Sequence, residues 1–187
     1  MRVDQFDYEL PPGHIALRPC RPRDAARLLV VDPNKDPCLS DRRMAELADV
    51  LRPGDAFVFN NTRVIPAVLL GRRKRKDSEA RVAVTLLKAL DGHRWQALAR
   101  PAKRLKPGDR IDFGATDGVC LQGTLGATVL DRHEDGEVIL SFEFHGPILE
   151  EAIAALGKMP LPPYIAARRP VDDRDSEDYQ TVYADRD

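Results

Sequence analysis

Between about residues 67 and 145, short apolar runs alternate with turn residues, and this pattern constrains the fold more than any other feature of the chain. The strand-length runs cover residues 81–87, 95–99, 110–113, 119–125, 127–131 and 137–144. The pairs Asp91-Gly92 and Asp135-Gly136 are typical of the turns that join hairpin strands. Five or more short strands within about eighty residues predict a small closed barrel or a sandwich.

The segments on either side of these strands have a mixed character. The run 27–32 has the length of a strand, and Ser40 is a suitable N-cap for a helix over 44–51. A further strand is predicted over 56–59. Residues 147–156 form a helix pattern, with proline near its start and glycine after its end. We therefore predict a mixed α/β platform domain (residues 1–66 and 147–187) that is interrupted by a β module (residues 67–146).

The composition is typical of a globular chain without a membrane span. Of 187 residues, 43% are hydrophobic and 32% are charged, and the formal net charge is −1. No apolar run approaches the roughly 20 residues that cross a bilayer. The N-terminus lacks the apolar core of a signal peptide, so we expect a cytoplasmic protein without a membrane partner.

Cysteine and histidine spacing predicts neither a metal site nor a disulfide framework. Cys20, Cys38 and Cys120 are odd in number and far apart, and the four histidines do not follow metal-ligand spacing. We therefore expect no metal.

A dense polar cluster follows the run 56–59. Asn60, Asn61, Thr62 and Arg63 supply two amides, a hydroxyl and a guanidinium in succession. Such directed donors at the end of a strand suit the binding of a sugar, a phosphate or a carboxylate. The alternative is a strand–turn–strand segment whose polar side chains only satisfy backbone groups.

A second candidate is a cationic loop between two predicted strands. Arg100, Lys103, Arg104 and Lys106 place four cations within seven residues, beside two prolines. The loop could contact a phosphate backbone, or it could be a solvated basic loop. The basic run 72–76 is more typical of a solubilising loop beside a turn.

Two weaker candidates lie near the C-terminus. Tyr164 could stack on a base, although the neighbouring prolines also predict an extended structural corner over 159–165. Gln180, Thr181 and Tyr183 could line a pocket or belong to a polar terminal strand. Neither a glycine-rich phosphate loop nor a nucleophile motif is present.

Seven motifs together resemble one known family. They are Phe6-Asp7-Tyr8-Glu9-Leu10-Pro11, Arg27-Leu28-Leu29-Val30, Pro53-Gly54-Asp55, the segment 59–67, the segment 100–109, the segment 157–165 and Tyr179-Gln180-Thr181-Val182-Tyr183-Ala184. Their order is similar to that in the S-adenosylmethionine:tRNA ribosyltransferase-isomerase family of queuosine biosynthesis. The resemblance covers essentially the whole chain.

The resemblance implies a fold, a reaction and two substrates. The family fold is a mixed α/β domain with an inserted antiparallel β-barrel. Members transfer the ribosyl group of S-adenosylmethionine to the aminomethyl-deazaguanine at the tRNA wobble position, and the product is epoxyqueuosine. S-adenosylmethionine is the ribosyl donor and tRNA is the partner. The general base is not identified by this resemblance.

We assign two groups of residues on this basis. Substrate binding is expected for Asn60, Asn61, Thr62, Arg63, Tyr164, Gln180, Thr181 and Tyr183. tRNA binding is expected for Arg100, Lys103, Arg104 and Lys106.

The chain departs from the family pattern in two places. Val68 stands where an arginine is usual. The sequence also stops after the segment 179–184, whereas the family continues for about as long again. We therefore expect a truncated chain that needs a complementary C-terminal chain or is inactive alone. The alternative function is a non-catalytic RNA-binding or interaction module that retains the barrel.

Overall fold

A computed structural model describes residues 2–75, 78–114 and 124–184. The chain forms two compact units. The first comprises Met1–Asn60 and Ala167–Arg169, and the second comprises Asn61–Ala166 and Pro170–Asp187.

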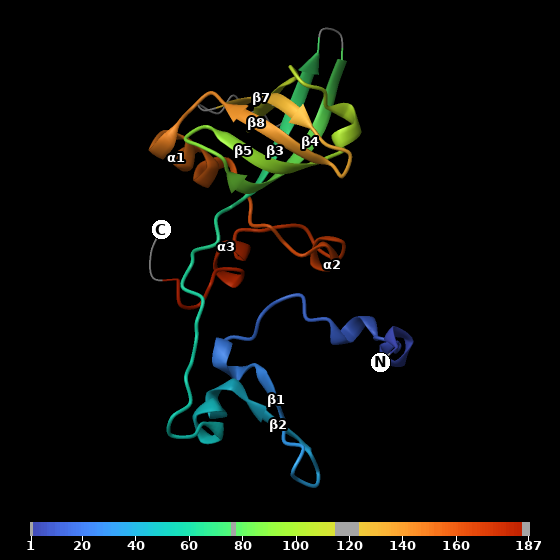
Figure 1. Cartoon of the computed structure of the whole chain (residues 1–187), viewed down its shortest axis with the longest axis vertical. Coiled ribbons are helices and arrows are strands. Elements are labelled where there is room, and N and C mark those ends of the chain that lie inside the picture. Colours follow the sequence, from blue (N-terminus) through green and yellow to red (C-terminus); the bar gives the residue numbers. More distant parts are fainter. Residues whose placement is uncertain (1, 76–77, 115–123, 185–187) are drawn as a thin grey trace. The chain divides into compact units, whose positions relative to one another are not determined.

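Six antiparallel strands of the second unit close into a barrel in the order β3-β4-β5-β8-β7-β6 (Figure 1). The strands are β3 (Val68–Arg75), β4 (Ser78–Ala89), β5 (Arg94–Arg100), β6 (Arg110–Phe113), β7 (Leu125–Arg132) and β8 (Glu137–Phe142). The strand pattern left a closed barrel and a sandwich open, and the structure shows the barrel that the family resemblance implies. The run 119–125 lies largely outside the described residues.

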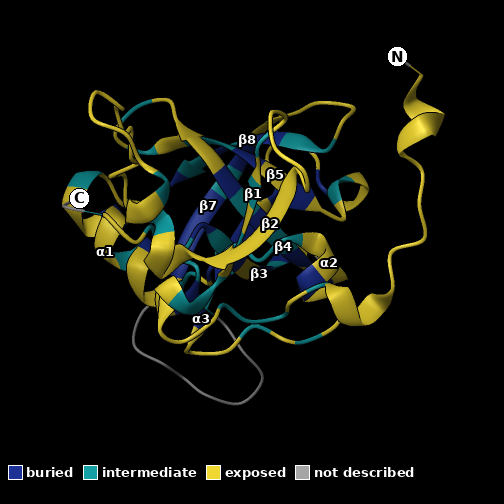
Figure 2. Ribbon diagram, turned by 90° about the horizontal axis from the view of Figure 1, so that it is seen from below, coloured by how far each residue is buried: buried dark blue, intermediate teal, exposed yellow. Residues whose placement is uncertain are grey.

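Alternating burial along the strands explains why the barrel forms. In β8, Val138, Leu140 and Phe142 are buried, and the residues between them are half-buried. This period of two sends every second side chain into the barrel. Figure 2 shows the buried residues gathered on these strands, where Phe113 and Leu69 are among the largest fully buried side chains.

One end of the barrel is covered by α1 (Gly146–Leu156), the helix that the sequence predicts over 147–156. Leu149 and Ile153 of α1 belong to the same buried cluster as the barrel interior. Two short helices follow, α2 (Pro163–Ala166) and α3 (Asp175–Asp178).

The first unit has little regular structure. Its strands β1 (Arg27–Val31) and β2 (Leu39–Arg43) pair antiparallel. Its short 3-10 helices are η1 (Val3–Phe6), η2 (Pro12–His14), η3 (Arg23–Ala25) and η4 (Met44–Val50). No residue from 2 to 60 is buried.

Two predictions for the first unit are wrong. Ser40 does not cap a helix, because it pairs with Val30 in the β1–β2 hairpin. The following helix is the 3-10 helix η4, and Glu46 Oε2 accepts a hydrogen bond from the Arg43 N–H at its start. The strand expected over 56–59 is absent, since no described strand pairs with it, and Val58 is 96% exposed.

Three predictions for the second unit are also wrong. The basic run 72–76 is no loop, because its described residues lie in β3. The corner over 159–165 is not extended throughout: α2 begins at Pro163, and proline is tolerated in the first turn of a helix. The polar terminal strand is replaced by turns, in which Tyr179 N–H donates to Asp175 O and Ala184 N–H donates to Thr181 O.

Candidate functional site

The backbone after Arg63 is held by the side-chain amide of Gln180. Val64 N–H donates to Gln180 Oε1 at 2.8 Å, and Gln180 Nε2 donates to Val64 O at 3.2 Å. Gln180 Oε1 also accepts the Thr181 N–H at 3.0 Å. These two bonds have the pattern of the bonds between neighbouring strands. They hold the backbone of the polar segment, which begins at Asn61 and leads into β3 at Val68.

The end of α1 gives the same segment a second support. Val68 and Lys158 exchange backbone hydrogen bonds of 3.1 and 2.8 Å. A Cβ atom at Gly157 would lie 1.9 Å from Pro66 O and 2.6 Å from Ile153 O. Only glycine therefore allows the backbone of α1 to approach the segment this closely.

A charged groove of about 550 Å³ lies along one side of the segment. Its lining residues are Arg63, Pro66, Ala154, Gly157, Lys158, Met159, Val171, Asp172, Asp173, Ser176 and Gln180. Arg63 and Lys158 contribute cations to this groove, and Asp172 and Asp173 contribute carboxylates. Residues of both signs of charge thus line one groove.

A more apolar groove of about 630 Å³ also borders the segment. Its lining residues are Thr62, Arg63, Ile65, Pro66, Trp95, Glu150, Glu151, Ile153 and Ala154. Arg63, Pro66 and Ala154 line both grooves. The guanidinium-bearing residue of the predicted cluster is therefore shared by two potential binding sites.

The structure brings together some of the predicted substrate-binding residues. Thr62, Arg63 and Gln180 line the grooves. Tyr164 and Tyr183 are each 58% exposed and line neither groove. Asn60 belongs to the first unit, while Asn61 and Thr181 lie in the second. The substrate-binding role of all eight residues stays a prediction.

Sequence reasoning missed the residues that complete the grooves. Lys158, Asp172 and Asp173 join Arg63, and Trp95 joins Thr62, although each pair is far apart in the sequence. The turn that carries the acidic residues has a local signal, because Asp172 N–H donates to the fully buried Asp175 carboxylate at 2.9 Å. Aspartates at this spacing are typical of capped turns.

The cationic loop leads from β5 to β6 and is anchored by a buried side chain and by hydrogen bonds. It contains the 3-10 helix η5 (Ala102–Arg104), and Leu105 behind it is fully buried. The Asp109 carboxylate accepts the Lys106 N–H at 2.8 Å and two bonds from the Arg75 guanidinium at 2.9 and 2.5 Å. Gly108 has a φ of +87°, which suits glycine at this turn.

The same bonds set the protonation of Asp109. Burial alone would raise the pKa of this carboxyl, but the hydrogen bonds from Arg75 and the Lys106 backbone outweigh burial and lower the pKa. Asp109 is therefore ionised at neutral pH, and it anchors the loop through charge-assisted hydrogen bonds.

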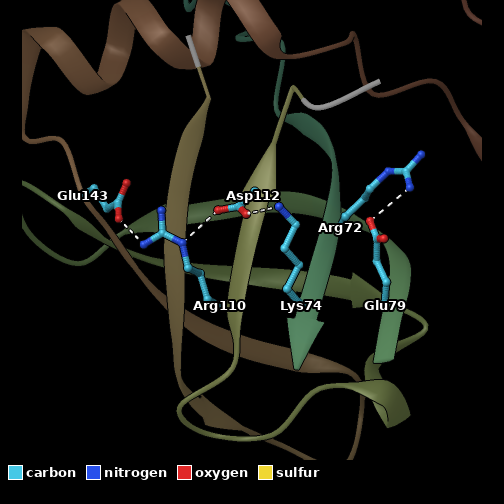
Figure 3. Close-up of polar contacts among 6 residues, drawn as sticks. All are labelled: Arg72, Lys74, Glu79, Arg110, Asp112 and Glu143. Atoms are coloured by element: carbon cyan, nitrogen blue, oxygen red, sulfur yellow. Dashed lines mark hydrogen bonds and ion pairs between the residues drawn. The ribbon is translucent and has the colours of Figure 1, made fainter. Parts of the chain in front are cut away.

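Cations of β3 and β6 form ion pairs with carboxylates of the same chain (Figure 3). Arg72 pairs with Glu79 at 3.0 Å, and Lys74 pairs with Asp112 at 3.2 Å. Arg110 bridges Asp112, at 2.9 Å, and Glu143. This chain of ion pairs neutralises the outer face of β3 and β6.

The cations of the loop differ from those of β3. Within the described parts of the chain, the side chains of Arg100, Lys103, Arg104 and Lys106 form no ion pair. These four side chains are therefore available to an anionic partner. Their role in tRNA binding stays a prediction.

No three His, Cys, Asp or Glu side chains come together as a metal site among the described residues. In those same residues, no helix has the length and apolar character needed to cross a bilayer.

The barrel, its two grooves and the cationic loop define a β-barrel protein with polar grooves on its surface. Sequence comparison then shows that the chain belongs to the Queuosine biosynthesis protein family, whose model matches residues 3–187. The resemblance inferred from the seven motifs is confirmed.

Individual relatives are similar over nearly the whole chain. A Bradyrhizobium sp. (strain BTAi1) protein described as S-adenosylmethionine:tRNA ribosyltransferase-isomerase is 58% identical over 184 residues, which are 98% of this chain and 50% of that protein. A Rhodopseudomonas palustris (strain BisA53) protein of the same description is 57% identical and covered to 51%. The chain therefore spans about half the length of the curated relatives it matches.

A solved structure is also similar in sequence. The S-adenosylmethionine tRNA ribosyltransferase of Thermotoga maritima is 37% identical. The match covers 79% of this chain and 48% of that one, with a TM-score of 0.35, which supports no comparison of folds.

Proposed function

We propose that the chain supplies part of the substrate-binding surface of an S-adenosylmethionine:tRNA ribosyltransferase-isomerase. In the proposed reaction, the ribosyl group of S-adenosylmethionine moves to the aminomethyl-deazaguanine at the tRNA wobble position and is isomerised. Adenine and methionine are released, and the product is epoxyqueuosine. The observation that carries this proposal is the 58% identity over 184 residues to a protein with that description.

The charged groove suits the methionine part of the donor. A free amino-acid group carries one carboxylate and one ammonium, and the groove offers cations and carboxylates to match them. In the proposed complex, Arg63 and Lys158 bind the carboxylate, and Asp172 and Asp173 bind the ammonium. Thr62 lies next to Arg63 and can donate a hydrogen bond to the ribose.

The polar cluster is assigned to holding the donor and not to removing a proton. The sulfonium makes the neighbouring ribose carbon acidic, so the reaction needs a general base. Asparagine amides, a threonine hydroxyl and an arginine guanidinium are donors that do not act as bases at neutral pH. Their contribution is to orient the ribose before the proton moves.

The cationic loop is proposed to contact the tRNA backbone. Phosphate contacts position a nucleic acid, and Arg and Lys side chains that form no ion pair among the described residues suit them. Arg100, Lys103, Arg104 and Lys106 meet this description.

The test of the proposed function is adenine release by a fusion protein. The chain is joined to the part of the Bradyrhizobium relative that lies beyond the matched region, and the fusion is incubated with S-adenosylmethionine and precursor tRNA. We expect adenine release, and we expect Arg63→Ala to raise the KM for S-adenosylmethionine at least tenfold, because it removes a charged hydrogen-bond partner. A folded fusion that releases no adenine, while the intact relative does so in the same assay, would contradict the proposal.

A further inference from the structure

Arg73 is a buried cation that forms no ion pair within the described parts of the chain. It is 6% exposed, and it follows Leu69 and Gly71 on the inward-facing side of β3. Its register partners are Ala80 in β4 and Ile111 in β6, which are both buried and apolar. A charge with such neighbours has lost most of its hydration, and this is costly unless an opposite charge lies beside it.

The hydrogen bonds of Arg73 use only part of its guanidinium. Arg73 Nη1 donates to Ser78 Oγ at 3.0 Å. The buried Nε–H finds no acceptor among the described residues. A guanidinium carries N–H donors on all three of its nitrogens, and the edge formed by Nε and Nη2 can bind two oxygens of one anion. Since buried donors are normally paired, this edge is suited to an anionic ligand.

The buried carboxylate at this end of the barrel does not neutralise Arg73. Asp109 already accepts two bonds from the Arg75 guanidinium and one from the Lys106 N–H. It interacts electrostatically with both Arg75 and Arg73, which lie two residues apart on the same side of β3. Two guanidiniums thus share one carboxylate, and one positive charge remains in excess.

We propose that this end of the barrel binds an oxyanion of the phosphate class against Arg73. Two of its oxygens accept from Nε and Nη2 of Arg73, and a third accepts from Nη1 of Arg75. A tetrahedral anion suits this arrangement better than a planar carboxylate, because its oxygens point in more directions. Binding shifts a neighbouring side chain, since the Arg73 Nε is buried. The site shares no residue with the two grooves, so it is separate from the proposed donor site.

Inorganic phosphate is the probe for this site. The melting temperature of the purified chain is measured in a series of sodium phosphate concentrations and in sodium chloride of equal ionic strength. Trp95 in β5 is the single tryptophan of the chain, so its fluorescence reports the unfolding of the barrel. Because phosphate would bind the folded state, we expect the melting temperature to rise by about 3–6 °C for each tenfold increase of phosphate above its Kd.

Three variants test the role of the guanidinium. Arg73→Met removes the charge from an apolar environment, so it should remain folded in chloride and should lose the phosphate-dependent rise. Arg73→Lys keeps the charge without the two-oxygen edge, and it should weaken phosphate binding about tenfold. Arg132→Met is the matched control, because Arg132 is exposed in β7, and it should keep the full rise. Phosphate also stabilises proteins through exclusion from their surface, but this general effect is common to all variants.

Binding of precursor tRNA to the fusion protein separates two sources of the phosphate group. For a phosphate of the RNA backbone, Arg73→Met should lower tRNA affinity about tenfold relative to Arg132→Met, and inorganic phosphate should compete with tRNA. For a free anion, both variants should bind tRNA equally, while the unmodified chain still responds to phosphate. The site is refuted if phosphate stabilises the unmodified chain no more than chloride does. It is equally refuted if Arg73→Met keeps the full phosphate-dependent rise.

Discussion

At the scale of single residues, the two grooves are lined by side chains that lie far apart in the sequence. Thr62 and Arg63 stand out in the sequence because polar donors follow one another there, and both line grooves. Lys158, Trp95 and Glu150 have no such local signal, since they reach the site only through the packing of α1 and β5. The substrate contact of Gln180 stays a prediction, and the structure shows that its amide binds the Val64 backbone.

The close approach of Gly157 to Pro66 can be tested by substitution. Gly157→Ala should lower the free energy of unfolding by about 1–3 kcal/mol, because the new methyl group would overlap the Pro66 carbonyl and the backbone would have to shift. The measurement is the urea midpoint, followed by circular dichroism. The control is Gly92→Ala, where an added Cβ meets no atom within 4 Å, and a change within about 0.5 kcal/mol is expected. Equal losses in both variants would show that the close approach to Pro66 is unimportant.

At the scale of elements, the sequence predicts strands well where apolar residues alternate and poorly where charge interrupts the pattern. β5 and β8 follow the alternation and were predicted. β3 was missed because Arg72, Arg73, Lys74 and Arg75 fill its second half, although Arg73 is buried. The terminal strand that includes Gln180, Thr181 and Tyr183 is absent for a different reason. The alternating side chains resemble a strand, but local hydrogen bonds form turns.

The role of Asp109 in anchoring the loop between β5 and β6 can also be tested by substitution. Asp109→Asn should destabilise the chain by about 1–3 kcal/mol at pH 7, because it removes the negative charge and one of the two oxygens that accept from Arg75. The folded-state pKa of Asp109 is lowered. Its stabilising contribution is therefore present above the unfolded pKa of about 3.9 and is lost as the pH falls through the folded pKa.

Urea unfolding at several pH values measures this effect. The difference between the unmodified chain and Asp109→Asn should be full at pH 7 and should shrink below about pH 4. Asp131→Asn is the matched control, since the Asp131 side chain is 61% exposed, and it should change little at any pH. A difference for Asp109→Asn that stays constant down to pH 2 would refute the ionic anchor.

At the scale of the whole molecule, strand β5 of the barrel connects the more apolar groove to the cationic loop. Near the start of β5, Trp95 lines the more apolar groove, and Arg100 ends the strand at the cationic loop. At about 3.3 Å per residue, these positions are roughly 17 Å apart. The strand can therefore hold the groove and the cationic loop at a fixed separation. Periodicity predicted the barrel, but it could not show which ends of the strands carry which residues.

The salt dependence of tRNA binding tests this arrangement. The comparison is between Lys103→Ala, in the cationic loop, and Lys74→Ala, whose ammonium already pairs with Asp112. Both variants lose one positive charge of the same type. In plots of log K against log salt, Lys103→Ala should reduce the slope by about 0.7–0.9, and an Arg100/Lys103/Arg104 triple alanine variant should reduce it by about 2–3. Lys74→Ala should leave the slope unchanged. Equal slopes for Lys103→Ala and Lys74→Ala would mean that tRNA responds to net charge alone and does not contact the loop.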